Sequence, residues 1–375
     1  MIYSFAFLIF LYGAIKIEHS TNLIKKRWFN IEWLILVLLA GFRYKIGGDT
    51  LSYMQSFEYI PQLNNLERFD IFNQSYEPLW YLLNSCCKTI CDSFFFFQFV
   101  HAIIVNTSVF YFFRRHSSRC FTSLFLYAVF FFFNYNTEIL RVAISISIFL
   151  YSFDFLIEKK FFKYYICCLL AFGFHYQSVV LILFPLCHLT KYPSRKITIY
   201  FISLTLVAYI SVSIIPQIAN LLSFTNRMQE TFDNYMSVES RTLNVFGLIS
   251  FFIKVNTWIL LLYLIRKEVT ILRFFVFFAI FCTIMSFKYS VIFGRTLEFA
   301  NPIIILLIVT KLRNRKFSNL VLIASVLFMW SSFYTWKVAG SRSYRQYYPY
   351  ATWFYPEEDM LRNNVIHELH PNVLF

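Results

Sequence analysis

Long apolar stretches recur along the whole chain and are separated by short polar connectors. Several have roughly the length, ~20 residues, that an α-helix needs to cross the hydrocarbon core of a bilayer. They predict spans at 2–15, 28–42, 94–113, 120–134, 137–157, 161–174, 176–190, 197–222, 246–265, 270–287, 293–310 and 317–336. The pattern is typical of an all-α polytopic membrane protein with about 12 transmembrane helices, forming a single integral membrane domain over residues 1–375.

One apolar segment, YEPLWYLLNSCCKTICD at 76–92, is too short to be read as a further span. If it crossed the bilayer, the basic tract RRHSSR that follows the next span would fall on the wrong side. We therefore predict a re-entrant or interfacial helix here, with Pro78 near its first turn, where a missing N–H matters little. The alternative is a thirteen-span protein in which this segment crosses.

Basic residues are concentrated in the short connectors. More than half of the 34 Lys and Arg are Lys16 or belong to one of six tracts: KKRW, RRHSSR, EKKFFK, KYPSRK, RKEVTILR and KLRNRK. Cytoplasmic loops carry such an excess of positive charge. This bias predicts that both termini face the opposite side, together with three longer outer segments, 43–92, 223–245 and 337–375.

Composition agrees with this class of protein. Hydrophobic residues make up 58% of the chain and charged residues 14%, against about 25% charged residues in soluble domains. The net charge of +14 is explained by the cytoplasmic connectors, so we expect no nucleic-acid partner. The eight cysteines lie in or beside apolar runs and fit neither a zinc pattern nor a disulfide framework.

Several ionisable residues lie near the predicted outer ends of spans, where charge is costly and usually faces a cavity. Arg43 ends the second span and is followed by Gly47, Gly48 and Asp49. One interpretation is that Arg43 contacts an anion beside a carboxylate able to orient or deprotonate a hydroxyl. The other is that Arg43 anchors the helix end and Asp49 caps the next helix.

Two further Arg–Glu pairs lie three residues apart. Glu138 with Arg141, and Arg295 with Glu298, have the spacing that places side chains on one face of a helix. Each pair is either an internal salt bridge or part of a wet cavity. His175, at the outer turn between two spans, is either structural or a group able to accept a hydroxyl proton.

The three arginines lie in separate spans but at a similar predicted depth on one side. Arginine forks bind phosphate oxygens in a bidentate manner. Convergence of Arg43, Arg141 and Arg295 therefore predicts a phosphate or pyrophosphate site at the outer membrane interface, where a lipid-linked phosphate would lie.

Several of these stretches resemble one family of bacterial polysaccharide proteins. The stretches are GFRYKIGGDTLSYMQSFEYI, YEPLWYLLN, ILRVAISISIFL, FGFHYQSVVLILFPL, FGRTLEFANPIIILLI and the late YPY. Together, and in this order, they resemble the EpsG family, which includes many Wzy-type O-antigen polymerases. One departure is that the family commonly has Arg-Gln where this chain has Arg141 and Val142.

The resemblance implies polymerisation of undecaprenyl-pyrophosphate-linked repeat units of an O-antigen or exopolysaccharide. The reaction would take place on the periplasmic face of the bacterial inner membrane. Arg141 and Arg295 would bind pyrophosphate, assisted by Arg43. Either Asp49 or His175 would be the base, with Glu77 positioning the base or the sugar. The supporting residues would be Glu138, Glu298 and Tyr53.

No D-x-D dyad stands in an obvious loop, so arginines could replace a metal, and we expect neither a metal nor a cofactor. The expected partners are the lipid-linked glycan and the bilayer, and the family implies a chain-length regulator. Two other functions stay open: a lipid-linked-glycan flippase or transporter, and a membrane acyltransferase that modifies a surface glycan.

Overall fold

The computed structural model describes residues 2–68, 74, 76–191, 258, 271–286, 289–311, 345–356 and 359–369. Apart from Trp258, the predicted spans 197–222, 246–265 and 317–336 and the predicted outer segment 223–245 lie outside these residues. Within the described ranges the chain is helical, with two isolated β-bridges and no strand. This confirms the all-α class, whereas the number of about 12 spans stays a prediction.

The described helices match the apolar stretches closely. Those that correspond to predicted spans are α1 (Ile2–Ile15), α2 (Asn22–Gly41), α5 (Phe94–His116), α6 (Cys120–Phe130), α7 (Leu140–Ile157), α8 (Phe161–Phe174), η5 (Tyr176–Lys191), α13 (Leu272–Met285), α14 (Ser290–Leu297) and α15 (Asn301–Lys311). The remaining ones are η1 (Ile17–His19), α3 (Thr50–Tyr59), η2 (Leu63–Arg68), α4 (Pro78–Ile90), η4 (Asn134–Glu138) and α17 (Met360–Leu369).

Three of the described segments, Ile2–His19, Phe94–His116 and Leu140–Ile157, are long and apolar enough to cross a bilayer unaided. A fourth crossing would be formed by α14 and α15 together, which bend by 48° at a short break. The predicted span 293–310 falls on this bent pair. The predicted span 176–190 is also unusual, because η5 is a 3₁₀-helix with Pro185 inside it.

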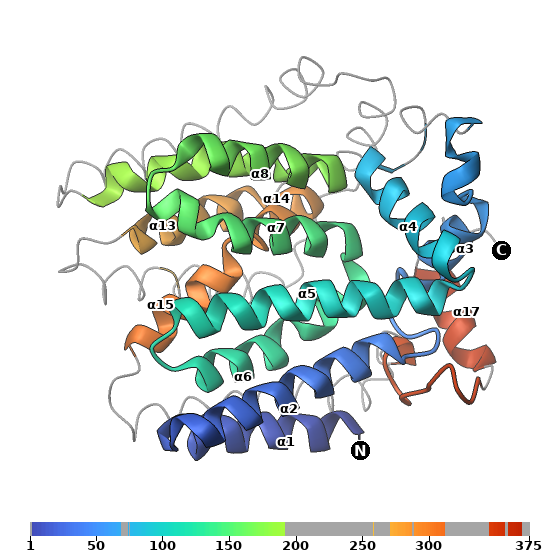
Figure 1. Ribbon diagram of the computed structural model, residues 1–375, viewed down its shortest axis with the longest axis horizontal. Helices are drawn as coiled ribbons and strands as arrows, with labels where there is room; N and C mark the ends of the chain where they lie inside the picture. Colours follow the sequence, from blue (N-terminus) through green and yellow to red (C-terminus); the bar gives the residue numbers. More distant parts are fainter. Residues whose placement is uncertain are drawn as a thin grey trace.

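Helices α1, α2, α5, α6, α7 and α8 run between two ends of a bundle (Figure 1). At one end, here the loop end, Gly48 N–H and the Tyr347 hydroxyl both donate to Glu138 Oε1, at 2.8 and 2.7 Å. At the other, the basic end, Thr122 N–H donates to Glu18 Oε2 at 2.9 Å, and Arg115 pairs with Asp154 at 2.6 Å. Successive long helices thus alternate in direction up to η5, as the basic tracts predict. Which end faces the periplasm stays a prediction.

Helix α4 begins and ends at the loop end (Figure 1). Its 13 residues span about 20 Å, well short of the ~30 Å hydrocarbon core. Near its carboxyl end, Lys88 Nζ donates to the carbonyls of Phe57 and Glu58 at the end of α3, at 3.0 and 2.9 Å. This geometry agrees with the re-entrant or interfacial helix predicted for 76–92, and Pro78 lies in its first turn as expected.

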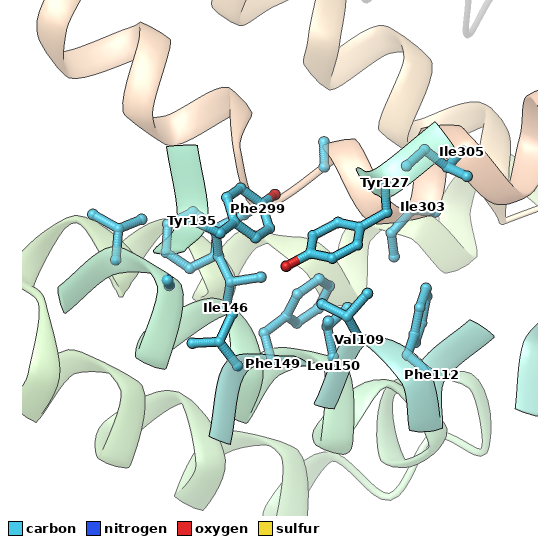
Figure 2. Packing of buried hydrophobic residues seen from close by; sticks show 14 of the residues in the cluster. Val109, Phe112, Tyr127, Tyr135, Ile146, Phe149, Leu150, Phe299, Ile303 and Ile305 are labelled. Atoms are coloured by element: carbon cyan, nitrogen blue, oxygen red, sulfur yellow. The ribbon is translucent and has the colours of Figure 1, made fainter. Parts of the chain in front are cut away.

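The bundle interior is a dense cluster of aromatic and branched side chains. Figure 2 shows labelled residues from α5, α6, η4, α7, the break before α15 and α15 itself: Val109, Phe112, Tyr127, Tyr135, Ile146, Phe149, Leu150, Phe299, Ile303 and Ile305. Such close packing provides much of the attraction between helices in lipid, where hydrophobic driving force between them is absent.

One polar network lies within this apolar interior and fixes the start of α7. Asn106 of α5 donates to Asn136 Oδ1 at 2.9 Å, Tyr127 of α6 donates to Asn106 Oδ1 at 3.2 Å, and Asn136 donates to Tyr127 at 3.2 Å. Each of these bonds gives a buried polar group a partner that lipid could not provide. Asn136 belongs to the π-turn η4, so the network holds in place the turn from which α7 begins.

The loop after α2 packs against η4 and the C-terminal tail. Gly47 has φ +107° and its N–H donates to Gln346 O at 3.1 Å. A Cβ at this position would lie 2.6 Å from Thr137 Cβ and 2.9 Å from Thr137 O. Glycine is therefore required twice, by the backbone conformation and by the close approach.

Gly47→Ala is expected to destabilise the protein by about 2 kcal/mol or more, because it combines an unfavourable backbone conformation with a steric clash. Thermal unfolding of the purified protein in detergent measures this loss. Gly294→Ala is the matched control, since a Cβ there meets nothing within 4 Å. Equal losses in both variants would contradict the requirement for glycine at 47.

The tail is fastened to the same loop by a buried arginine. Arg362 of α17 is 1% exposed and donates to the carbonyls of Arg345 and Tyr44, at 3.2 and 3.4 Å, and to that of Pro349. Predicted outer segments far apart in the sequence, 43–92 and 337–375, therefore meet in one assembly at the loop end.

Candidate active site

Glu77 is the centre of a buried cluster of charged and polar groups. Its side chain is 3% exposed. Arg141 Nη1 donates to Glu77 Oε2 at 2.5 Å, His175 Nδ1 lies 2.8 Å from Glu77 Oε1, and Tyr176 N–H donates to Oε1 at 3.2 Å. One carboxylate thus joins the start of α4, the start of α7 and the turn between α8 and η5.

Each of the three ionisable residues stands at a helix terminus. Glu77 precedes Pro78, which favours an extended conformation, and it has φ −74° and ψ 150° as the N-cap of α4. Arg141 is the second residue of α7, directly after η4 and Ile139. His175 is the C-cap of α8, with φ −159° and ψ 122°. The helix ends direct these side chains to a single point.

The charge state of Glu77 follows from its partners. Burial by itself would raise its pKa, but the Arg141 guanidinium and the His175 N–H outweigh burial and lower the pKa from 4.5 to about 2. Glu77 is therefore an anion at physiological pH, and an ionised carboxylate only accepts hydrogen bonds. Nδ1 of His175 must carry the hydrogen in their contact.

His175 has the opposite tendency. Burial lowers its pKa below the usual value of 6.5, and this effect exceeds the opposing attraction of Glu77. The imidazole is then neutral near pH 7, with hydrogen on Nδ1 and a free electron pair on Nε2. A carboxylate that orients a neutral histidine in this way prepares Nε2 to accept a proton.

Arg141 lies over an aromatic ring as well as against Glu77. Its Cζ is 4.4 Å from the centroid of the Tyr76 ring, within the range of cation–π attraction. The Tyr76 hydroxyl is in turn 3.0 Å from Ser56 Oγ of α3. The guanidinium is therefore held on two sides, by a ring and by a carboxylate.

The predicted residues Asp49 and Arg295 act through their charges on the region that contains Tyr53, a further predicted residue. Burial raises the pKa of Tyr53. The charges of Arg141 and Arg295 lower this pKa, and the charge of Asp49 raises it. Arg295 of α14 also lowers the pKa of His175. A second arginine from a distant part of the chain therefore lies within electrostatic range of His175.

Asp49 occupies the N-cap position of α3, but its side chain makes no capping hydrogen bond. The alternative interpretation, in which the Asp49 side chain caps the next helix, therefore does not hold. Among the other supporting residues, Glu298 Oε2 accepts from Asn301 Nδ2 at 2.8 Å. The roles of Asp49 and Glu298 in chemistry stay predictions.

The predicted placement of Glu138 and Arg141 on one helix face is wrong. The π-turn η4 ends at Glu138 and Ile139 interrupts the helix, so the two residues belong to different elements. Glu138 accepts from Gly48 and Tyr347 instead, and Arg141 binds Glu77. Local spacing failed here because a π-turn changes the rotation per residue.

Arg43 is also at the loop end, where its guanidinium binds the protein's own backbone. It is 1% exposed, and its Nη1 and Nε donate to the carbonyls of Ala40 and Ile46 at 2.5 and 3.2 Å. These contacts close the turn after α2. Its assisting role toward pyrophosphate stays a prediction.

Two residues at the site did not stand out in the sequence pattern: Tyr76, under Arg141, and Gln177, whose Oε1 is 3.2 Å from His175 Nε2. The only signal for either was its position beside Glu77 or His175. Within the part of the chain that the structure describes, no three His, Cys, Asp or Glu side chains form a group able to hold a metal.

Comparison with known proteins gives one match. A family model described as the EpsG family matches residues 26–352, a range that includes Glu77, Arg141, His175 and Arg295. No curated protein and no solved structure shows a significant match to the chain. Because the match spans most of the sequence, and agrees with the resemblance of its motifs, this protein belongs to the EpsG family.

Proposed function

We propose that this protein is a polysaccharide polymerase, a glycosyltransferase that joins undecaprenyl-pyrophosphate-linked repeat units at the outer face of the bacterial inner membrane. The observation that carries the proposal is the buried Glu77 carboxylate, which binds both Arg141 and His175 Nδ1. This pairing puts a proton acceptor beside an anion-binding cation. Family membership supports a polymerase-type role independently of this geometry.

In the proposed step the growing glycan leaves its own lipid carrier. The bond between its anomeric carbon and the pyrophosphate oxygen breaks, and the electron pair leaves with the lipid pyrophosphate. A hydroxyl oxygen of the incoming unit forms the new bond to that carbon. The proton of this hydroxyl passes to Nε2 of His175, which Glu77 keeps oriented through Nδ1.

Arg141 and Arg295 take the second role, stabilisation of the negative charge that develops on the leaving pyrophosphate. Arg141 is positioned for this by Tyr76 and Glu77, and Arg295 acts on the same region through its charge. We prefer His175 to Asp49 as the base because His175 has a bound orienting carboxylate.

His175→Ala is expected to reduce polymer formation about 10²- to 10⁴-fold, the range typical for loss of a general base. The measurement is a surface-glycan profile on gels, with the gene deleted and then complemented by wild type or variant at verified membrane levels. On such gels a polymerised glycan gives a ladder of bands that differ by one repeat unit. His19→Ala, which removes an exposed histidine at the basic end, should leave this ladder unchanged.

The deletion strain distinguishes the competing functions. Loss of the ladder with a single repeat left on the lipid core supports a polymerase. If even the single repeat disappears, export becomes the better explanation. An intact ladder that lacks only a substituent would favour an acyltransferase, and a normal ladder in abundant His175→Ala would exclude His175 as the base.

A further inference from the structure

The carboxamide of Gln177 lies against the one ring nitrogen of His175 that the Glu77 contact leaves for chemistry. Its Oε1 is 3.2 Å from His175 Nε2, and its own Nε2 is buried with no hydrogen-bond partner among the described residues. Two acceptors, a carbonyl oxygen and a neutral imidazole nitrogen, would thus face each other while a donor is left unused.

Rotating the carboxamide by half a turn removes both conflicts. The N–H₂ group of Gln177 then donates to His175 Nε2, and hardly any heavy-atom position changes. The arrangement also agrees with a neutral His175, since Nδ1–H is already committed to Glu77. The pairing of donors with acceptors therefore favours a hydrogen bond that Gln177 donates to His175 Nε2.

We propose that Gln177 is a positioning residue that covers the basic nitrogen of His175 until an acceptor sugar hydroxyl displaces it. The displaced carboxamide has both a donor and an acceptor to offer this hydroxyl, so it holds the incoming sugar while His175 takes the proton. The identity of the acceptor rests on the proposed function. The hydrogen bond from the Gln177 carboxamide to His175 Nε2, called the cover below, rests on geometry alone.

The effect of removing the cover has a defined sign. A donor on Nε2 stabilises the neutral imidazole, so its loss raises the pKa of His175. Glu77, Arg141 and Arg295 also face this ring from α4, α7 and α14, and they are unchanged in a Gln177 variant. The acid limb of the activity profile should therefore move to higher pH.

Diethyl pyrocarbonate, which acylates an unprotonated imidazole nitrogen, is the first probe. With Gln177→Ala at a pH where His175 is neutral, His175 should be modified about fivefold faster than in wild type, the factor expected for one lost hydrogen bond. Mass spectrometry of the His175 peptide gives the rate. Val179→Ala, which alters an exposed side chain in the same helix, is the control and should match wild type.

The second probe is the pH profile of polymer synthesis from purified lipid-linked repeats. Gln177→Ala should shift the acid limb upward by about 0.7 of a pH unit, the same fivefold factor, and raise KM for the acceptor more than it lowers kcat. A downward shift would mean that an imidazolium donates to Gln177, which overturns the proposal. An unchanged modification rate also overturns it.

The two probes separate this inference from the proposed function. The modification rate requires no turnover, so faster labelling in Gln177→Ala supports the cover even when the protein fails to polymerise glycans. A working polymerase in which Gln177→Ala behaves as wild type in both probes retains the proposed function and excludes the cover.

Discussion

Glu77→Gln is expected to lower polymer formation by at least about a hundredfold, the lower range for loss of general-base catalysis, with the protein still present in the membrane. The amide is almost isosteric, so the change removes a charge with little change in packing. It leaves Arg141 buried without its carboxylate and removes the anion that holds His175 Nδ1–H. Proton acceptance by His175 and stabilisation of the leaving pyrophosphate by Arg141, the two proposed roles of the site, are therefore both weakened. The glycan profile of a complemented deletion strain measures the effect.

The pH dependence of Glu77→Gln is an additional test. Removing the negative charge takes away the attraction that raises the pKa of His175. Any residual activity should thus have its acid limb at lower pH than in wild type.

Stability should respond to pH through Glu77 as well. The folded-state pKa of Glu77 is lowered from 4.5 to about 2. Its contribution to stability is therefore complete above about pH 4.5 and is lost as the pH falls toward 2. Wild type should lose more thermal stability than Glu77→Gln between about pH 5 and about pH 3.

Asp92→Asn is the control for Glu77→Gln. It removes a carboxylate that is 60% exposed and only 3.7 Å from Lys88, just after the same helix, and exposed pairs of this kind contribute about 1 kcal/mol or less. Its ladder should be normal. A normal ladder in Glu77→Gln as well would remove the basis for the site.

Arg141→Lys is expected to reduce polymer formation about a hundredfold, a typical loss for one group that stabilises developing charge. Lysine keeps the charge but lacks the planar fork that contacts Tyr76 and Glu77 and that is proposed to bind a phosphate. Arg115→Lys, at the basic end, changes a half-exposed arginine bonded to Asp154 and should leave the ladder intact. A ladder of wild-type length in Arg141→Lys would exclude a bidentate phosphate contact by Arg141.

The stability of the buried pair provides a test that is independent of catalysis. Arg141→Met alone leaves the Glu77 anion buried without its cation, which costs about 3–5 kcal/mol. In Arg141→Met/Glu77→Gln no anion is left, so the double variant should be more stable than Arg141→Met. Thermal unfolding in detergent measures both. A double variant less stable than the single one would contradict the cost assigned to an unpaired Glu77 anion.

The sequence by itself determined the helical class and the positions of most helices. Hydrophobic length and the distribution of Lys and Arg report on the bilayer directly, since each residue contributes to them independently of distant residues. The ranges 2–15 and 161–174 agree with α1 and α8 at both ends. The same local information indicated Arg141, His175 and Arg295, because an ionisable residue beside an apolar stretch stands out without knowledge of its partner.

The partners themselves were decided by the tertiary structure. Local spacing favoured Glu138 for Arg141, but a π-turn separates the two, and the carboxylate that binds Arg141 comes from Glu77, 64 positions away in the chain. Glu77 reaches His175 over a separation of 98 positions. No periodicity in the sequence encodes such pairings. They arise because α4 and α7 begin, and α8 ends, at one point, where a buried carboxylate must find every donor within reach.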